Sequence, residues 1–202
     1  MSIKRLAIAG IIAAALTLTA CTGTGNQNPT TSPTDTATPS PTATTVAPPA
    51  DEEEAITNAD AALTNWLAVR GEVNAAGGTD TDRLEALAVG RALELTLNDA
   101  ATIAEGPVLN ESGQNVEGPA TTEGAFVHET ITAYSQQYED ITHGLVTLNA
   151  CQDASGYVIT TNDGSPAMRP ENPRVVVDYQ VIYEAERQAW LVYDVISLGE
   201  TC

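Results

Sequence analysis

Two side chains in this sequence are suited to acid–base chemistry, the imidazole of His128 and the carboxylate of Asp178. A histidine that is hydrogen-bonded to a carboxylate can accept and return a proton near neutral pH, provided that the two groups lie within about 3 Å of each other. His128 and Asp178 fall on different predicted strands, and no spacing in the sequence guarantees that distance. We therefore assign no catalytic residue and keep His128 and Asp178 as candidates only; a structural role on a strand is the main interpretation for His128.

Tyrosines on the same predicted strands could line a pocket with these two residues. They are Tyr134, Tyr138, Tyr179 and Tyr183. Alternate side chains of a strand share a face, so Tyr134 and Tyr138 would point to the same side as His128 if no bulge intervenes. Asp178 has the opposite parity to the two tyrosines of its own strand, so those three cannot all face one pocket. Packing in the core or on the sheet surface is the alternative for the tyrosines.

Motifs that carry other chemistry are absent from the sequence. It has no glycine-rich phosphate loop, no Gly-x-Ser-x-Gly, no His-Glu-x-x-His and no calcium loop with its aspartate spacing. A metal site is not expected, because neither His128 nor His143 lies at ligand spacing from the cysteines. No cofactor is expected either.

The N-terminus has the features of a secretory leader. Lys4 and Arg5 precede an almost unbroken apolar run over residues 6–18, which is too short to cross a bilayer that needs about 20 helical residues. The run ends in Leu18-Thr19-Ala20-Cys21, which resembles the lipobox of bacterial lipoproteins. This resemblance implies that residues 1–20 are a cleaved signal peptide. It also implies that Cys21 carries fatty acyl chains such as palmitate, two chains being enough for stable anchoring to the extracytoplasmic face of the cell membrane. The alternative is an ordinary secreted protein with an incidental Cys21.

Assigning Cys21 to the lipid leaves Cys151 and Cys202 as an even pair in an exported chain. Outside the cytoplasm such a pair is expected to form a disulfide. The bridge would also hold the last residue of the chain, which would otherwise fray.

The charge of the chain excludes a class of partners. The leader contains Lys4, Arg5 and no acid, so its removal takes the formal charge from −19 to −21. Such a charge repels nucleic acid phosphates and anionic lipid headgroups. We therefore expect no nucleic-acid binding, and we expect the membrane contact to be made by the lipid on Cys21.

Composition divides the remainder of the chain into two parts. Residues 21–50 contain ten threonines and six prolines and no large apolar side chain, so they are predicted to be a disordered linker. Residues 51–202 are long enough for one globular head. A predicted helix begins at Asp51, whose side chain can cap it, and ends at Gly77-Gly78. A second helix starts at residues 79–82, and a third lies between Gly90 and Gly106. Its apolar stripe is predicted to be Leu93, Leu97, Ala100, Ala101 and Ala104.

Residues 107–123 are predicted to be a polar loop with one short strand near Val108, and after them the periodicity changes to that of strands. The predicted strands are 126–138, 141–153, 157–161, 174–184 and 190–198. The fold class predicted is α+β, with N-terminal helices packed on a mostly antiparallel sheet of four to six strands.

Several segments together resemble a known family. They are Cys151-Gln152-Asp153, the strand at 174–183, and Trp190-Leu191-Val192 followed by terminal Cys202. In this pattern the head resembles actinobacterial lipoproteins with a nuclear transport factor 2-like domain, the cone fold that is also grouped as cystatin-like. The resemblance implies that the helices pack into the mouth of a strongly curved sheet. That fold carries enzymes as well as binding proteins, so it does not decide function.

The sequence therefore favours a membrane-anchored binding or interaction module of the cell envelope, with an unidentified ligand. One alternative is a small-molecule-binding protein or an isomerase- or cyclase-type enzyme that uses the cone cavity, with His128 and Asp178 as acid and base. Another is a structural subunit bound to a larger envelope protein. An enclosed apolar cavity reached by His128 or Asp178 would favour the enzyme, whereas a contiguous apolar patch outside the cone would favour the protein partner.

Overall fold

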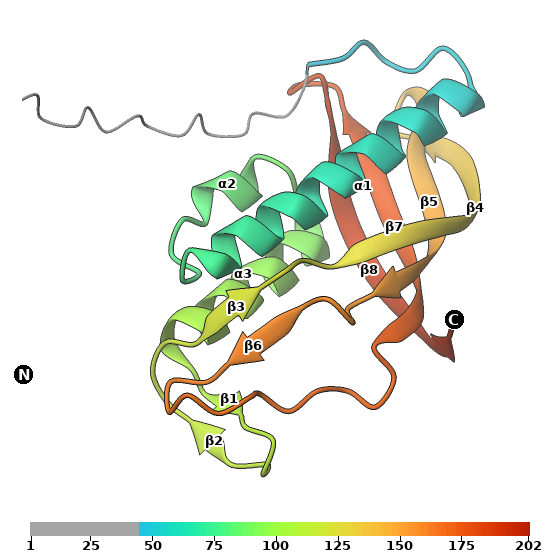
Figure 1. Ribbon diagram of the computed structural model, residues 1–202. Helices are drawn as coiled ribbons and strands as arrows, with labels where there is room; N and C mark the ends of the chain where they lie inside the picture. Colours follow the sequence, from blue (N-terminus) through green and yellow to red (C-terminus); the bar gives the residue numbers. More distant parts are fainter. Residues whose placement is uncertain (1–44) are drawn as a thin grey trace, which may run out of the picture. The chain divides into compact units, whose positions relative to one another are not determined.

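The computed structural model describes residues 45–202, which form one packed unit (Figure 1). The predicted signal peptide, Cys21 and the linker as far as residue 44 lie outside the described residues. The helices are α1 (Glu52–Ala75), α2 (Asp82–Glu85) and α3 (Gly90–Glu105). The strands are β1 (Val108–Leu109), β2 (Asn115–Val116), β3 (Thr121–Glu123), β4 (Val127–Tyr138), β5 (Ile141–Asp153), β6 (Val158–Thr160), β7 (Arg174–Glu184) and β8 (Ala189–Thr201). The predicted α+β class and the predicted order of helices before strands are confirmed.

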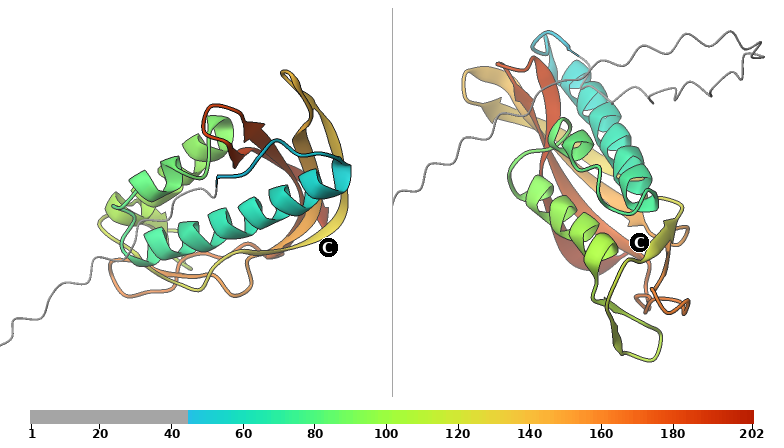
Figure 2. Two further views of the ribbon diagram at one scale, coloured as in Figure 1. Left: turned by 90° about the horizontal axis from the view of Figure 1, so that it is seen from above. Right: turned by 90° about the vertical axis from the view of Figure 1, so that its left-hand side faces the viewer.

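The long strands form a four-stranded antiparallel sheet in the order β4-β5-β7-β8. Two short antiparallel pairs, β1 with β2 and β3 with β6, lie beyond one end of it. Figure 2 shows α1 and α3 on the same face of this bent sheet. The short strands β1, β2 and β3 lie within residues 107–123, where only a short strand near Val108 was expected in a loop. Strands of two or three residues leave no periodic signal in the sequence.

Helix α1 begins where its capping residues predict. The Asp51 carboxylate accepts a hydrogen bond from the Glu54 amide at 2.9 Å, and the Glu54 side chain accepts one from the Ala50 amide at 2.8 Å. These bonds satisfy amides that would otherwise lack partners at the helix start. The helix ends before Gly78, whose φ of +72° suits glycine.

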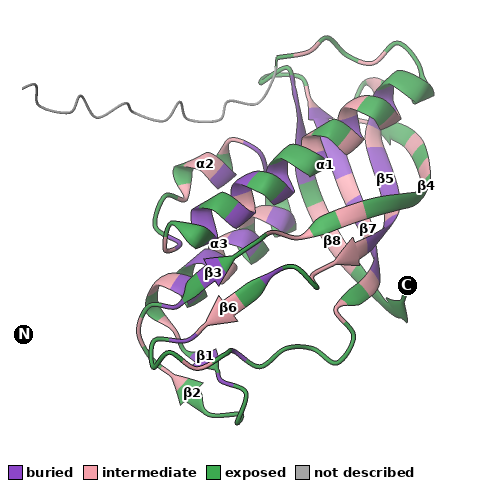
Figure 3. Cartoon of the chain, viewed as in Figure 1, coloured by how far each residue is buried: buried purple, intermediate pink, exposed green. Residues whose placement is uncertain are grey.

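The core lies between α1 and the inner face of the sheet (Figure 3). Leu63 and Trp66 of α1 pack against Leu148 of β5 and Tyr179 and Val181 of β7, and all five are at most 2% exposed. Burying each such side chain contributes about 1.5–3 kcal/mol relative to leaving it in water. The predicted alternation of β7 is confirmed, because its odd-numbered residues from 177 to 183 all enter this core.

The buried face of α3 differs from the predicted stripe. Its buried residues are Ala92, Thr96, Ala100 and Ile103, whereas Ala101 is exposed. The prediction followed the leucines and alanines, but Ile103 packs away from the main core against Val108 and Ala120. Helix α3 thus contributes buried residues both to the main core and to the cluster around Val108.

Both ends of the described chain are held against the fold. The Val46 amide donates to the Gln188 carbonyl at 2.7 Å, and the Tyr183 hydroxyl donates to the Val46 carbonyl at 2.9 Å. Packed structure therefore begins before Asp51, inside the segment predicted as linker. At the other end, the sulfur atoms of Cys151 and Cys202 lie at disulfide distance, which confirms the predicted pairing. No helix within residues 45–202 is both long and apolar enough to cross a membrane.

Candidate functional site

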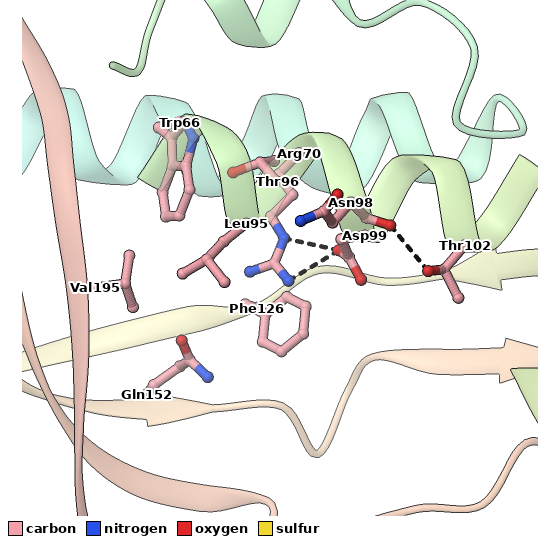
Figure 4. A pocket seen from close by; sticks show the side chains of 10 residues that line it. All are labelled: Trp66, Arg70, Leu95, Thr96, Asn98, Asp99, Thr102, Phe126, Gln152 and Val195. Atoms are coloured by element: carbon pink, nitrogen blue, oxygen red, sulfur yellow. Dashed lines mark hydrogen bonds and ion pairs between the residues drawn. The ribbon is translucent and has the colours of Figure 1, made fainter. Parts of the chain in front are cut away.

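A half-open cavity of about 400 Å³ lies between α1, α3 and the sheet. Figure 4 labels the ten residues that line it. Trp66 and Arg70 come from α1, Leu95 and Asp99 from α3, and Gln152 from β5. We call this space the Arg70 cavity, because its central polar group is the guanidinium of that residue.

Helix spacing places the polar residues of α1 beside the cavity. Trp66, Arg70 and Asn74 are four residues apart, so their side chains lie on one face of the helix. Trp66 and Asn74 are buried, whereas the Arg70 side chain keeps 18% of its surface exposed. An arginine between two buried positions needs a partner for its charge.

That partner is Asp99 on α3. Arg70 donates to the same carboxylate oxygen, Oδ2, through Nε at 3.0 Å and through Nη2 at 2.8 Å. The Asn74 side-chain amide donates to this oxygen as well, at 3.0 Å. Three N–H groups from α1 thus hold one carboxylate of α3, and the two helices are fixed to each other at the cavity.

Aromatic rings hold the guanidinium from its other sides. Its central carbon lies 4.2 Å from the centre of the Phe126 ring and 5.9 Å from that of Trp66. A guanidinium over an aromatic face is stabilised by about 0.5–2 kcal/mol. The ion pair with Asp99 and the contact with the Phe126 ring together fix the position of the Arg70 guanidinium. Its remaining nitrogen, Nη1, has no hydrogen-bond partner among residues 45–202.

The network continues to Tyr157 and a second cavity. The Asn74 amide donates to the Tyr157 hydroxyl at 2.9 Å, and the Tyr157 ring lies 4.6 Å from that of Phe126. Burial, with the nearby Asp99 carboxylate, raises the pKa of Tyr157 above its usual value. A space of about 190 Å³, lined in part by Asp99, Phe126 and Met168, lies next to it.

Gln152 is held in place by a tyrosine of the neighbouring strand. The Tyr179 hydroxyl donates to Oε1 of Gln152. Burial raises the pKa of Tyr179 far above its usual value, so its hydroxyl stays protonated and remains a donor. The amide nitrogen Nε2 of Gln152 has no partner within the described part of the chain and is free to donate.

His128 points toward α1, away from Asp178. Its Nε2 lies 3.0 Å from Oδ1 of Asp60, and the Thr130 hydroxyl donates to the same oxygen at 2.8 Å. The His128 side chain is 8% exposed. It lines a separate space beside Leu67 on the other side of α1, and it does not line the Arg70 cavity.

The structure does not bring the two candidates His128 and Asp178 together. Asp178 lies on the face of β7 opposite to Tyr179, where its Oδ1 accepts a hydrogen bond from Asn149 at 2.7 Å. His128 lies on the same face as Tyr179, and their ring centres are 6.3 Å apart. The sheet therefore separates the histidine from the aspartate, and they cannot exchange a proton directly.

A bulge overturns the predicted shared face of His128 and Tyr134. The pairing of β4 with β5 shifts between Thr130 and Thr132, which inserts one residue into β4. After the shift, Ala133 packs against the core and Tyr134 is 46% exposed. Tyr138 likewise packs with Leu145 in a different cluster from the main core. No tyrosine of β4 joins His128 on the inner face.

Ser135 is the centre of a small polar cluster that the sequence did not suggest. Its Oγ lies 2.7 Å from Nδ1 of His143, and its amide donates to Glu52 of α1 at 2.9 Å. Because Ser135 lies between the histidine and the carboxylate, the histidine is not oriented by an acid as in a hydrolase triad. The cluster ties β4 to the start of α1.

The residues that build the Arg70 cavity were missed from the sequence. A signal was present, since Arg70 and Asn74 continue the helix face of the apolar residues Leu63 and Trp66. Nothing in the sequence, however, pointed from that face to Asp99 on another helix or to Gln152 on a strand. Within the described residues, no group of three or more His, Cys, Asp or Glu side chains could hold a metal ion.

Comparison with known proteins adds little to this description. No family model and no curated protein matches this sequence. Among solved structures, the chain is similar to the intermembrane space region of chloroplast protein ARC6, with 10% sequence identity, a coverage of 71% of this chain and 96% of that chain, and a TM-score of 0.41. At that TM-score the similarity supports no conclusion about fold or function.

Proposed function

We propose that this protein is a lipid-anchored binding protein of the cell envelope, and that its head holds a small molecule in the Arg70 cavity. Two features of the sequence support the anchor, namely the short apolar leader and the Leu18-Thr19-Ala20-Cys21 segment. The pairing of Cys151 with Cys202 fits an exported chain, because disulfides persist outside the cytoplasm. Helices on one face of a bent antiparallel sheet are what a cone-fold head would have.

The observation that carries the binding function is the construction of the cavity. Its volume of about 400 Å³ falls in the range of small-molecule sites. Four apolar side chains, Trp66, Leu95, Phe126 and Val195, line it together with six polar ones. Arg70 is held by an ion pair and an aromatic ring, and Gln152 by a buried hydroxyl. Groups that are fixed before binding lower the entropy cost of binding a ligand.

The same geometry favours binding over acid–base catalysis. The titratable groups that line the cavity are Arg70 and Asp99, and they are bonded to each other. An arginine stays protonated at all ordinary pH values. The Asp99 oxygen that faces Arg70 already accepts three hydrogen bonds from Arg70 and Asn74. The candidates from the sequence, His128 and Asp178, lie outside this cavity.

The anchor is tested by the fate of the head in the cell. Mass spectrometry of the membrane-extracted protein should find a diacylated cysteine at the new N-terminus, and Cys21→Ser should release the head to the medium. A head that stays on the membrane in the Cys21→Ser variant would contradict lipid anchoring.

Ligand binding is tested with the full Cys21→Ser chain, purified from the medium and incubated with a small-molecule extract of the cell envelope. Bound compounds are released by denaturation and identified by mass spectrometry. Leu95 is 43% exposed and lines the cavity, so Leu95→Trp should fill it without disturbing the core. Leu109 is equally exposed at 40% and lies on β1, so Leu109→Trp is the matched control. A compound retained by the parent and by Leu109→Trp, and lost by Leu95→Trp, supports the proposal. Equal retention by both variants would refute it.

A further inference from the structure

We infer that the ligand of the Arg70 cavity is a small uncharged ring with several hydroxyl groups, of the kind found in a sugar unit. This inference rests on the proposed binding function and names the class of ligand. It follows from the mixture of polar and apolar groups on the wall, from the hydrogen-bonding capacity that the polar groups keep free, and from the charge balance of the site.

One face of α3 supplies much of the polar wall. Four residues at three- and four-residue steps lie on the same side of this helix and line the cavity, namely Leu95, Asn98, Asp99 and Thr102. In Figure 4, the three polar members of this set lie on the right, whereas Leu95 lies on the left with Trp66 and Val195. A ligand that fills the cavity therefore meets polar groups on one side and apolar surface on the other.

The polar groups of the wall keep both donors and acceptors free. Arg70 keeps the N–H groups of Nη1, and Gln152 keeps those of Nε2. The Oδ1 atom of Asp99 and the side-chain amide of Asn98 have no hydrogen-bond partner within residues 45–202. A hydroxyl group both donates and accepts, so a ligand with several hydroxyls can pair with either kind of group. Each hydroxyl can use a different protein group, so no two of these groups have to reach the same ligand atom.

The apolar side of the cavity fits the ring that carries such hydroxyls. Trp66, Leu95 and Val195 present aromatic and branched surfaces there. A sugar ring has carbon–hydrogen bonds on its faces, which can cover these surfaces while the hydroxyls at its edge meet α3. A volume of about 400 Å³ lies at the lower end of the range for small-molecule sites, which suits one or two such rings.

Charge favours an uncharged ligand. Arg70 and Asp99 compensate each other across 2.8 Å, so they leave no net charge for an ion to balance. An anion would also be repelled by a chain with a formal charge of −19. A zwitterion such as an amino acid would have to lose the hydration of two ions for partners that are already paired. Hydroxyl groups lose much less when they leave water.

Six probes test the inference on the full Cys21→Ser chain. The methyl pyranosides of glucose, galactose and mannose carry the ring and its hydroxyls in three configurations. Glucuronate adds a carboxylate to this ring, glutamine is a zwitterion, and cyclohexylmethanol has a single hydroxyl on an apolar ring. Affinities are measured by titration with saturation-transfer NMR. We expect at least one pyranoside to bind about tenfold more tightly than each of the last three probes, the effect of one or two additional hydrogen bonds.

Two variants of α3 test its polar face and leave the ion pair intact. Asn98 and Thr102 are exposed, so Asn98→Ala removes the free amide and Thr102→Val removes a hydroxyl without opening the core. Each should weaken the bound pyranoside about two- to tenfold, the effect of one hydrogen bond. Glu94→Ala is the control, because Glu94 is exposed on the same helix and does not line the cavity; it should leave the affinity unchanged. Equal affinities in the parent, Asn98→Ala and Thr102→Val would contradict the inference, and so would an equal loss in Glu94→Ala.

The outcomes separate this inference from the proposed function. If glucuronate, glutamine or cyclohexylmethanol binds most tightly and Leu95→Trp abolishes that binding, the cavity binds small molecules but the ligand class is wrong. If a pyranoside binds equally well to the parent and to Leu95→Trp, its site lies outside the cavity and the inference is wrong. If no pyranoside binds at millimolar concentration, the ligand class is wrong, and the compounds retained from the envelope extract still decide the proposed function.

Discussion

The bond between Arg70 and Asp99 should be the strongest polar contribution to stability between α1 and α3. Two unit charges about 4 Å apart attract each other by about 4 kcal/mol at the effective dielectric constant of a protein surface. The two side chains keep 18% and 27% of their surface exposed, so water screens part of this attraction and desolvation opposes it. We therefore expect a net coupling energy of about 2 kcal/mol, between the values for exposed and for buried pairs.

A double-mutant cycle measures this energy. Arg70→Met keeps an unbranched aliphatic side chain and removes the guanidinium, and Asp99→Asn keeps the shape of the acceptor. Each single variant should lower the free energy of unfolding by about 2–3 kcal/mol, because it leaves the other charge half-buried without its partner. The double variant should lose less than the sum of the two, and the difference is the coupling energy. Urea unfolding, followed by circular dichroism with the disulfide intact, supplies all four values.

A pair with a far more exposed arginine is the control. Arg91 of α3 lies 3.7 Å from Asp194 of β8, and the two side chains are 60% and 21% exposed. The same cycle on this pair should give a coupling energy below about 0.5 kcal/mol. A coupling energy for Arg70 with Asp99 that is no larger than this control would refute the view that the pair organises the cavity.

Three further predictions concern the rest of the head. Replacing Cys151 and Cys202 by alanine should lower the free energy of unfolding by up to about 4 kcal/mol, because the bridge closes a loop of 51 residues in the unfolded chain; urea unfolding of the parent and the variant checks this. Gly78→Ala should lower the free energy of unfolding by at least about 2 kcal/mol, since the φ of Gly78 is +72° and an added Cβ would lie 2.1 Å from a backbone oxygen of α3. Gly77 has a φ of +94° and open space around it, so Gly77→Ala should lower the free energy of unfolding by about 1 kcal/mol. Similar values for the two variants would contradict the packing of this turn. Hydrogen bonds from Ser165 and Thr161 lower the pKa of Asp163 to about 2, below its value in the unfolded chain. The contribution of Asp163 to stability is therefore present above about pH 4 and is lost as the pH falls through about 2. The free energy of unfolding of Asp163→Asn, measured between pH 2 and pH 5, should depend less on pH than that of the parent.

Local patterns in the sequence were enough to predict most of the elements. The acids after Asp51 predicted the start of α1, and Gly77-Gly78 predicted its end. The strict alternation in residues 174–184 predicted the bounds of β7 and which of its residues face the main core, whereas Val176 and Ile182 on its other face are buried as well. These features depend on neighbouring residues and on a fixed period, and both can be read from the chain. The pairing of Cys151 with Cys202 followed from the count of cysteines.

Contacts between distant residues were decided by the tertiary structure alone. The register shift after Thr130 turned Tyr134 outward, and nothing in residues 126–138 distinguishes a bulged strand from a regular one. His128 contacts Asp60 because α1 crosses the inner face of the sheet next to the start of β4. The Arg70 cavity also depends on tertiary packing. Its Arg70 lies on α1, its Asp99 on α3 and its Gln152 on β5, and the bend of the sheet sets how far apart these elements lie. Sequence alone thus determined the elements, and packing determined which side chains met.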